Sequence, residues 1–345
     1  MPEVLVTGGS GFFGGVLKRQ LLADGFAVTN IDIVRDTDRQ PALTSVQGDL
    51  RNPACLENVF RGRRFDAVFH CAAILAHGRV SDREIWTANV EGTRSLAEAA
   101  RRAGVPKLVF ISTNCLWGRN LGHAVREDDP PAPVEIYGRS KLAAEELLTG
   151  YTQAMEITTL RSPTIISSGR LGLLAILFEF IQENRTVWVV GSGLNRYQFI
   201  YAPDLVQACL AAFRSRGSDT FHVGSDNVQA LRDVYEAVIR RAGSRSRVGS
   251  LPKGLTLAAL HLAHSLRISP LGPYHYKMIA EDFLFDTTRI KTRLGWQPTL
   301  SNADMLSEAY AYYAERRHEI EARTDVSAHS RPAEMGIVRL VKWLS

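Results

Sequence analysis

The sequence has few cysteines, and their positions do not follow a metal-binding or disulfide pattern. The four are Cys55, Cys71, Cys115 and Cys209. They lie far apart, no C-x-x-C pair occurs, and no histidine stands at ligand spacing from them. Zinc sites and disulfide frameworks both show themselves as characteristic spacings. We therefore expect neither, and no metal.

Long apolar runs and a one-sided charge are also missing. No stretch of about 18 apolar residues, the length of a membrane-spanning helix, occurs. The chain opens on the strand-like run Glu3–Thr7, which leaves no room for a signal peptide. The net charge of +5 is spread over short basic clusters interleaved with acids, which is weak evidence for nucleic acid. We expect a cytoplasmic protein that does not bind nucleic acid. The apolar tail 337–345 could touch a membrane surface, or dock on its own domain or a partner subunit.

The first regular unit that the sequence contains is a buried strand, a glycine-rich turn and a helix. Gly8, Gly11 and Gly14 are spaced three apart between the apolar run Val4–Thr7 and a helical pattern that continues through Leu22. This spacing lets the backbone approach a pyrophosphate and points helix N–H groups at it. The turn therefore predicts a dinucleotide site.

The next two strands carry acids that bear on the choice of cofactor. The strand Ala27–Asp32 ends in an acid 18 residues beyond the last of these glycines. A carboxylate there accepts hydrogen bonds from the adenosine ribose and repels a 2′-phosphate, which favours NAD over NADP. Arg35 could serve such a phosphate instead. A third strand ends at Gly48–Leu50, where Asp49 could meet the adenine amino group or cap the helix 53–60.

Strands and helices continue to alternate after this point. The strand 67–73 ends in small residues, as needed where backbone passes close to a cofactor, and a helical pattern carrying Asn89 precedes the strand Lys107–Thr113. Alternation at this spacing predicts an α/β protein with a Rossmann-type, doubly wound parallel sheet. We expect an NAD-binding domain at 1–160. We further expect the last sheet strands and a smaller substrate-binding lobe at 161–322, and a polar linker with an apolar tail at 323–345.

Tyr137 and Lys141 form the pair around which the chemistry is predicted. If they open a helix, they stand one turn apart on the same face. A lysine ammonium beside a phenol favours the phenolate and brings its pKa, ordinarily about 10, closer to working pH. Such a tyrosine can exchange a proton with a secondary alcohol while hydride leaves or reaches the same carbon. The alternative is an ordinary surface helix.

Taken together, these motifs resemble the extended short-chain dehydrogenases/reductases, the NAD-dependent epimerase/dehydratase family. The resemblance runs from Val4 to about Pro298, on the segments Thr7–Gly14, His70–Ala73, Asn89, Ser112–Thr113, Tyr137, Lys141, Leu160–Arg161, Asp204 and Leu294–Pro298. It implies that Thr113 hydrogen-bonds the substrate oxygen, that Tyr137 is the acid/base, and that Lys141 contacts the nicotinamide ribose and tunes Tyr137. It also implies a homodimer formed through the helices of Asn89 and Tyr137. The cofactor residues that it implies are Gly8, Gly11, Phe12, Phe13, Gly14, Asp32, Asp49, Leu50, Cys71, Ala72, Ala73, Asn89, Ser112, Tyr137, Lys141 and Pro163.

The residues after Thr113 bear on the reaction type. Dehydratases of the family carry an acidic pair or a glutamate there, because eliminating water needs both a base and an acid. This chain has Asn114–Cys115 instead. Some relatives that epimerise carbons next to a keto group place a cysteine at the position of Cys115, where a thiol of lowered pKa could exchange a proton. The alternative for Cys115 is a small buried residue. We expect a nucleotide-sugar epimerase and not a dehydratase.

The second half departs from the sugar-nucleotide enzymes that the first half resembles. Tyr197 stands where they have an arginine for the substrate phosphate. We expect Thr164 and Arg196 to contact the substrate, with Arg170 or Lys277 as other cations that could replace the missing one.

An apolar helical repeat leaves a second function open. The segment 251–266 looks more like relatives of the 3β-hydroxysteroid dehydrogenase type, whose lobe receives apolar ligands. The alternative is therefore an NAD(P)-dependent dehydrogenase or reductase of an apolar alcohol or ketone. A cofactor-binding regulatory module without turnover is a third hypothesis, against which the intact Thr113, Tyr137 and Lys141 argue.

Overall fold

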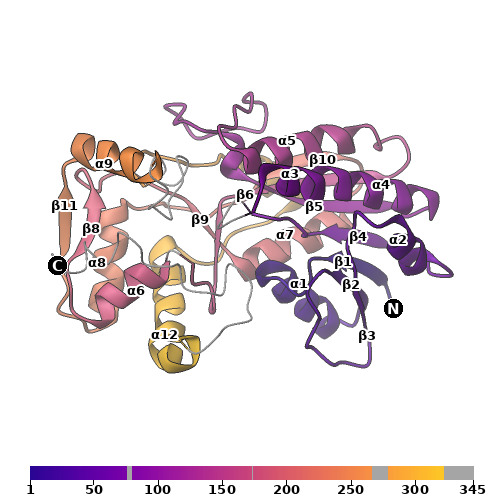
Figure 1. Ribbon diagram of the computed structural model, residues 1–345, viewed down its shortest axis with the longest axis horizontal. Coiled ribbons are helices and arrows are strands. Elements are labelled where there is room, and N and C mark those ends of the chain that lie inside the picture. The colour runs from indigo at the N-terminus through magenta and orange to yellow at the C-terminus, as the bar shows by residue number, and fades with distance from the viewer. Residues whose placement is uncertain (76–79, 173, 266–278, 322–345) are drawn as a thin grey trace.

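The larger part of the molecule is a seven-stranded sheet flanked by helices, and this computed structural model describes residues 1–75, 80–172, 174–265 and 279–321 (Figure 1). The strands of the sheet are β1 (Glu3–Thr7), β2 (Ala27–Asp32), β3 (Leu43–Gln47), β4 (Ala67–His70), β5 (Lys107–Thr113), β6 (Glu156–Ser162) and β10 (Asp219–His222). The helical elements beside them are α1 (Phe12–Ala23), α2 (Pro53–Phe60), α3 (Asp82–Trp86), the π-helical turn η1 (Thr87–Glu91), α4 (Gly92–Arg102), the short turn η2 (Asn114–Leu116), α5 (Ile136–Thr149), α7 (Ala202–Arg214) and α11 (Thr288–Leu294).

The strand order is β10-β6-β5-β4-β1-β2-β3, and all six pairings are parallel. Side chains alternate across the sheet: Val4 and Val6 pack in the core with α1 and α7, whereas Leu5 packs in the core with α2, α4 and α5. The predicted doubly wound parallel sheet is confirmed. Its order reverses between β1 and β4, so the glycine-rich turn after β1 lies at the switch point where such sheets bind ligands.

Helix α2 shows how local chemistry sets an element boundary. Asn52 precedes the helix, and its Oδ1 accepts the N–H of Ala54 at 3.1 Å, while Pro53 occupies the first helical position. The helix therefore spans the expected residues. Its cap is Asn52, so the alternative role of Asp49 as the cap is wrong.

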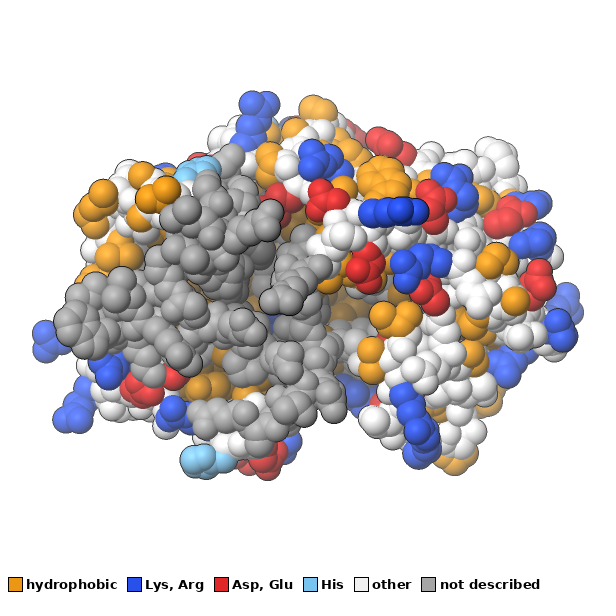
Figure 2. All heavy atoms as spheres, in the orientation of Figure 1, with side chains coloured by type: hydrophobic (Ala, Val, Ile, Leu, Met, Phe, Trp, Pro, Cys, Tyr) orange, Lys and Arg blue, Asp and Glu red, His pale blue; other side chains and the backbone are white. Residues whose placement is uncertain are grey.

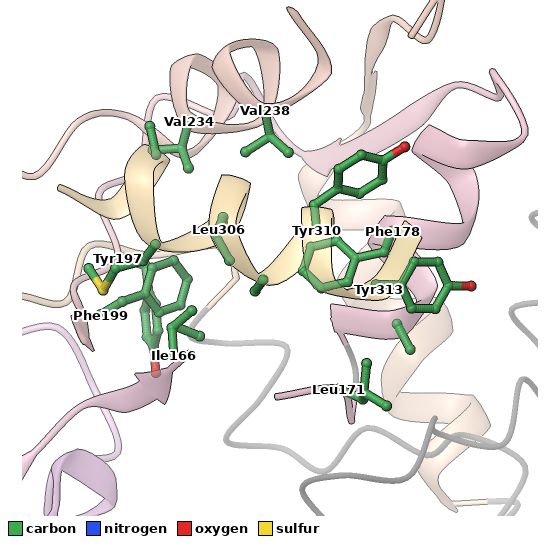
Figure 3. Close-up of a cluster of buried hydrophobic side chains, with 14 of the residues drawn as sticks. Ile166, Leu171, Phe178, Tyr197, Phe199, Val234, Val238, Leu306, Tyr310 and Tyr313 are labelled. Carbon is green, nitrogen blue, oxygen red and sulfur yellow. The ribbon is translucent and has the colours of Figure 1, made fainter. Parts of the chain in front are cut away.

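A smaller lobe packs beside the sheet, to the left in Figure 1. Its elements are β7 (Thr164–Ile166), α6 (Leu174–Gln182), β8 (Val187–Val190), β9 (Phe199–Tyr201), α8 (Leu231–Arg241), β11 (Val248–Leu251), α9 (Lys253–Ser265) and α12 (Asn302–Glu321). Phe178 of α6 packs against Tyr310 and Tyr313 of α12, with ring centroids 5.8 and 5.7 Å apart (Figure 3). Two short parallel pairs, β7 with β9 and β8 with β11, complete the lobe.

The order of elements interleaves the two parts. β6 runs across residue 160, the predicted domain boundary, and β10 returns to the large sheet after β7, β8 and β9 of the lobe. The expectations for Lys277, for the end of the 251–266 segment and for 323–345 fall outside the described residues. In the part of the chain that the structure describes, no helix is long and apolar enough to cross a membrane. No group of His, Cys, Asp and Glu side chains in that part could hold a metal ion. On the face in Figure 2, acids and bases are interspersed over the sheet-based part.

Candidate active site

The glycine-rich turn joins β1 to α1, and close backbone contacts require glycine at two of its positions. Gly8 has a left-handed φ of +74°, and a Cβ there would lie 2.8 Å from the backbone of Ala72. A Cβ at Gly14 would collide with the carbonyl of Gly8, whose oxygen also accepts the N–H of Gly11 at 3.0 Å. The start of α1 is therefore held directly against the ends of β1 and β4, an arrangement suited to a pyrophosphate at a helix N-terminus.

A buried series of hydrogen bonds ties this turn to α4. Oγ1 of Thr7 accepts the N–H of Ala72 at 3.2 Å and lies 2.7 Å from Nδ1 of His70. The other ring nitrogen, Nε2, lies 2.8 Å from Oγ1 of Thr93, which donates its proton to the carbonyl of Asn89 at 2.6 Å. Nε2 must therefore carry the ring proton, and Nδ1 accepts from Thr7. Burial lowers the pKa of His70 to about 3, which keeps the ring neutral.

Asn89 connects this network to the helix that carries the candidate acid/base. It lies in the π-helical turn η1, where its Oδ1 accepts the N–H of Ile74 at 2.7 Å and its Nδ2 donates to the carbonyl of Ile74 at 3.0 Å. Nδ2 also donates to Oγ of Ser140 at 3.0 Å, and that hydroxyl donates to the carbonyl of Tyr137 at 2.8 Å. The first turn of α5 is thus fixed through the same network as the glycine-rich turn.

Tyr137 lies in the first turn of α5, packed against the end of β5. A Cβ at Gly138 would collide with the carbonyl of Cys115, so the helix rests directly on the turn η2. Thr113 ends β5, and its Oγ1 accepts the N–H of Cys115 at 3.1 Å. The Thr113 side chain is also hydrogen-bonded to the Tyr137 phenol. The structure therefore brings together Thr113, Tyr137 and Cys115, three residues that the sequence singled out.

Several neighbouring groups act on the pKa of the Tyr137 phenol. Burial raises the pKa of Tyr137 above its ordinary value of 10, and a negative charge on Cys115 would raise it further. The positive charge of Arg170 and the hydrogen bond with Thr113 lower it. Arg170 is therefore a cation that favours ionisation of Tyr137. The tuning of Tyr137 by Lys141 stays a prediction.

Lys141 stands one turn after Tyr137 on α5, as predicted, and is 3% exposed. Its Nζ lies 3.9 Å from the centroid of the Phe110 ring, within the range of a cation–π contact. Burial lowers the pKa of Lys141 to about 7, whereas the negative charge of Glu145, one turn further on, raises it. Glu145 is itself buried and paired with Arg161, Nη2 to Oε2 2.7 Å.

The two predicted adenosine-side acids are both engaged with nearby groups. Asp32 ends β2, and its two oxygens accept the N–H groups of Ser10 and Val34, each at 2.9 Å. Asp49 is paired with Arg51, Nη2 to Oδ2 2.6 Å, and this pairing lowers the pKa of its carboxyl. Asp32 therefore lies beside the glycine-rich turn as expected. The contacts of both acids with a cofactor stay predictions.

Four further residues from the cofactor set have clear structural surroundings. Phe13 and Leu50 are buried and pack in the cores on the two faces of the sheet. Burial raises the pKa of the Cys71 thiol to about 12, so the thiol is neutral. Pro163 connects β6 to β7, and its carbonyl accepts the hydroxyl of Ser162 at 2.8 Å. Contact of these residues with a cofactor stays a prediction.

The residues present fit a nicotinamide dinucleotide. The turn at Gly8 and Gly14 accommodates a pyrophosphate, and Asp32 stands where a ribose acceptor is needed. The hydroxyl of Ser112, buried at the end of β5 next to Thr113, has no hydrogen-bond partner among the described residues. A buried polar group of this kind calls for a partner, which a bound cofactor can provide.

A polar cluster on the lobe side faces these elements. The hydroxyl of Tyr197 accepts from Nδ2 of Asn114 at 3.2 Å and lies 3.0 Å from Oγ1 of Thr164. In Figure 3 the Tyr197 ring packs beside Phe199, with its hydroxyl pointing away from α12. Arg170 is close enough to Tyr197 and Tyr137 that both act on its pKa, which burial lowers to about 10. We call Asn114, Thr164, Arg170 and Tyr197 the lobe-side cluster.

The predicted substrate residue Arg196 lies outside the lobe-side cluster. Its side chain is about half exposed and pairs with Asp282, Nη2 to Oδ2 3.4 Å. Beside it is an open groove of about 480 Å³, formed by residues of the lobe and the loop after η2. The residues that line this groove are Asn120, Val190, Gly191, Ser192, Gly193, Leu194, Asn195, Lys253, Ala280, Glu281 and Asp282.

Sequence reasoning missed two of the residues that hold the site. Ser140 connects Asn89 to α5, and Asn30 accepts the N–H of Gly9 at 2.9 Å. Asn30 did carry a signal, because a polar amide in the middle of a buried strand needs a partner. Ser140 carried a weaker one, as a small polar residue between the two members of the Tyr137–Lys141 pair.

Comparison with known proteins identifies the family. A family model described as the NAD dependent epimerase/dehydratase family matches residues 4–224. The chain is 31% identical to a UDP-glucose 4-epimerase of Streptomyces lividans, over 90% of this chain and 96% of that protein. It is 32% identical to the uncharacterised protein y4nG of Sinorhizobium fredii, over 99% of this chain and 86% of that protein.

Solved structures show the same fold. The UDP-glucose 4-epimerase of Thermotoga maritima with UDP-glucose superposes with a TM-score of 0.75 at 23% identity, over 91% of this chain and 99% of that one. The UDP-glucuronic acid 4-epimerase of Bacillus cereus with NAD superposes with a TM-score of 0.74 at 22% identity, over 93% of this chain and 99% of that one. These matches give no specific support to features of the 3β-hydroxysteroid dehydrogenases. From the length of the family match and the identity with curated relatives, the chain belongs to the NAD-dependent epimerase/dehydratase family.

Proposed function

We propose that this protein is an NAD-dependent nucleotide-sugar epimerase that acts by transient oxidation of a secondary alcohol. The observation that carries the proposal is the position of Tyr137 in the first turn of α5, which rests on the turn after Thr113 and is tied to Asn89 through Ser140. Thr113 also acts on the pKa of the Tyr137 phenol. The similarity to epimerases of UDP-sugars supports the substrate class. Asn114–Cys115 in place of an acidic pair argues against elimination of water.

Each residue has a separate task in this reaction. Thr113 holds the substrate hydroxyl, and Tyr137 as phenolate takes its proton while hydride leaves the same carbon. A bound NAD would supply the hydride acceptor of this reaction and, once reduced, the hydride donor. When hydride is returned to the opposite face of the carbonyl carbon, Tyr137 returns the proton to the oxygen. The configuration of that carbon is then inverted, and the sugar is neither oxidised nor reduced overall. Arg170 helps Tyr137 to ionise, because its positive charge lowers the pKa of the phenol.

The lobe supplies the remaining substrate contacts in this proposal. Thr164 and Tyr197 offer hydroxyl groups beside Asn114, and Arg170 supplies positive charge for an anionic part of the substrate. The groove beside Lys253 has room for the nucleotide end. This arrangement replaces the arginine that sugar-nucleotide relatives carry at the position of Tyr197.

Product analysis with parallel monitoring of NADH tests the proposal. The purified protein is incubated with NAD and, in turn, with UDP-, GDP- and dTDP-hexoses, and products are resolved by chromatography and NMR. We expect one sugar nucleotide to be converted to its epimer while NADH does not exceed the enzyme concentration. NADH that rises in step with an oxidised product would instead identify a net dehydrogenase. Conversion of none of the sugars would contradict the substrate class.

A further inference from the structure

A lysine is buried beneath the glycine-rich turn. Lys18 lies on α1 and is 1% exposed, with its Nζ 2.6 and 2.7 Å from the two carboxylate oxygens of Asp36 and 2.9 Å from Asp38. Like its neighbour Leu17, Lys18 is a buried residue of α1. An apolar side chain at this position would need no ion-pair partner. A buried ion pair costs desolvation and is weak evidence for stability alone. Its contacts therefore point to a role other than filling the core.

Asn30 connects the ion pair to the turn. Its Nδ2 donates to Oδ2 of Asp36 at 2.7 Å and to Oγ of Ser10 at 3.3 Å, and its Oδ1 accepts the N–H of Gly9 at 2.9 Å. An ionised carboxylate can only accept, so the nitrogen of the amide must face Asp36 and the oxygen must face Gly9. The charge of Asp36 thereby sets the direction of the amide.

Lys18 keeps Asp36 in the required ionised state. Burial alone would raise the pKa of the Asp36 carboxyl, but hydrogen bonds from Lys18, Asn30 and the backbone of Asp38 hold it below its usual range. Without the lysine, a protonated or displaced Asp36 would not constrain the Asn30 amide. The lysine therefore acts on the turn through two other side chains.

The turn is in direct contact with this network. A Cβ at Gly9 would collide with the Asn30 side chain, so glycine is needed there because the amide lies against the backbone. Asn30 holds the N–H of Gly9 and Asp32 holds the N–H of Ser10, at the same time as Gly8 adopts its left-handed conformation. Two successive peptide groups are thus fixed before a ligand binds, which lowers the ordering cost of binding.

We propose that Lys18, Asp36 and Asn30 form a positioning network that holds the glycine-rich turn ready for the pyrophosphate of the dinucleotide. The proposal rests on the cofactor class of the family and not on the sugar substrate. Because it is tested by cofactor binding without turnover, its failure and a failure of the proposed epimerase reaction are distinguishable.

The test measures NADH binding by fluorescence titration, after removal of any co-purified nucleotide and in the absence of a sugar. Lys18→Met removes the cation, and Lys107→Met is the matched control. Lys107 is also buried, at 4% exposure, and pairs with Glu156 at 2.9 Å, but it lies at the opposite end of β5 from Thr113. We expect both variants to melt at a lower temperature, but only Lys18→Met to raise the dissociation constant of NADH by about tenfold or more.

A double variant tests whether Lys18 acts through the charge of Asp36 and the orientation of the Asn30 amide. In Lys18→Met/Asp36→Asn, an amide oxygen at position 36 can still accept from Asn30 without a neighbouring cation, so NADH affinity should return to within about threefold of wild type. Asn30→Ala removes the acceptor of the Gly9 N–H directly and should repeat the loss, which keeps the test decisive if Lys18→Met does not fold. Wild-type affinity in folded Lys18→Met or Asn30→Ala, or an equal loss in Lys107→Met, would overturn the proposal.

Discussion

The cofactor side and the lobe side of the site are held by different kinds of contact. On the cofactor side, the turn at Gly8 is fixed by backbone contacts and by buried hydrogen bonds that run from Thr7 through His70 to Asn89. On the lobe side, Asn114 and Tyr197 come from loops 83 residues apart and meet through single side-chain contacts. The difference implies that binding of cofactor and of substrate can be disturbed separately.

The largest difference between an effect on turnover and an effect on cofactor binding is expected for Tyr137. Tyr137→Phe removes the proton-transfer group and the partner of Thr113, and leaves the glycine-rich turn intact. General acid–base groups contribute roughly 10²–10⁴-fold, so the turnover number should fall by about that factor. The dissociation constant of NADH should change by less than about threefold. Steady-state kinetics and NADH titration check the two halves, and Tyr151→Phe, near the end of α5, is the control for loss of a phenol. Activity near wild type in Tyr137→Phe would contradict both enzyme hypotheses.

A smaller effect, confined to the lobe side, is expected for Tyr197→Phe. The change removes the hydroxyl that accepts from Asn114 and contacts Thr164, and a typical hydrogen bond contributes about 1 kcal/mol. The KM for the sugar substrate should therefore rise by about five- to tenfold, with NADH affinity unchanged. Tyr310→Phe is the matched control, because its hydroxyl donates to Oε1 of Gln182 at 2.8 Å within the lobe. Weaker NADH binding with an unchanged KM would show that the two sides are not separate.

The same contrast explains how much the sequence could predict. The strand–turn–helix unit, Asp32 and the Tyr137–Lys141 pair are local patterns with a fixed spacing, and the fold that they predict is confirmed. Such features depend on residues close in sequence, which is why they can be recognised without a structure.

The parts that escaped prediction depend on long-range packing. Arg196 and Tyr197 are neighbours in the sequence, but one pairs with Asp282 at the surface and the other joins Asn114 in the lobe-side cluster. Lys18 would be placed on the solvent face of α1 by its chemistry, whereas Asp36 compensates its charge inside the protein. In each case the partner is supplied by another loop, and no local pattern specifies it.

A last effect concerns stability in acid and should leave catalysis at neutral pH unchanged. The large sheet contains two neutral buried histidines: His70 in β4, between Thr7 and Thr93, and His222 in β10, whose Nδ1 donates to the carbonyl of Val125 at 3.0 Å. Burial lowers the pKa of both from 6.5 to about 3. Between these values the unfolded chain binds more protons than the folded one, so the free energy of unfolding falls as the pH falls from 6.5 towards 3.

The loss should be roughly 2 kcal/mol for each histidine at pH 5, on the scale of 1.36 kcal/mol per pKa unit. Thermal melting between pH 7.5 and pH 5 would show it as a falling melting temperature. His70→Asn and His222→Asn should each flatten that dependence, although both destabilise the protein at pH 7.5. Only His70→Asn should also weaken NADH binding, because only His70 belongs to the series of hydrogen bonds that ties the glycine-rich turn to α4. A melting temperature that stays constant down to pH 5 in the wild type would contradict the assignment of neutral rings.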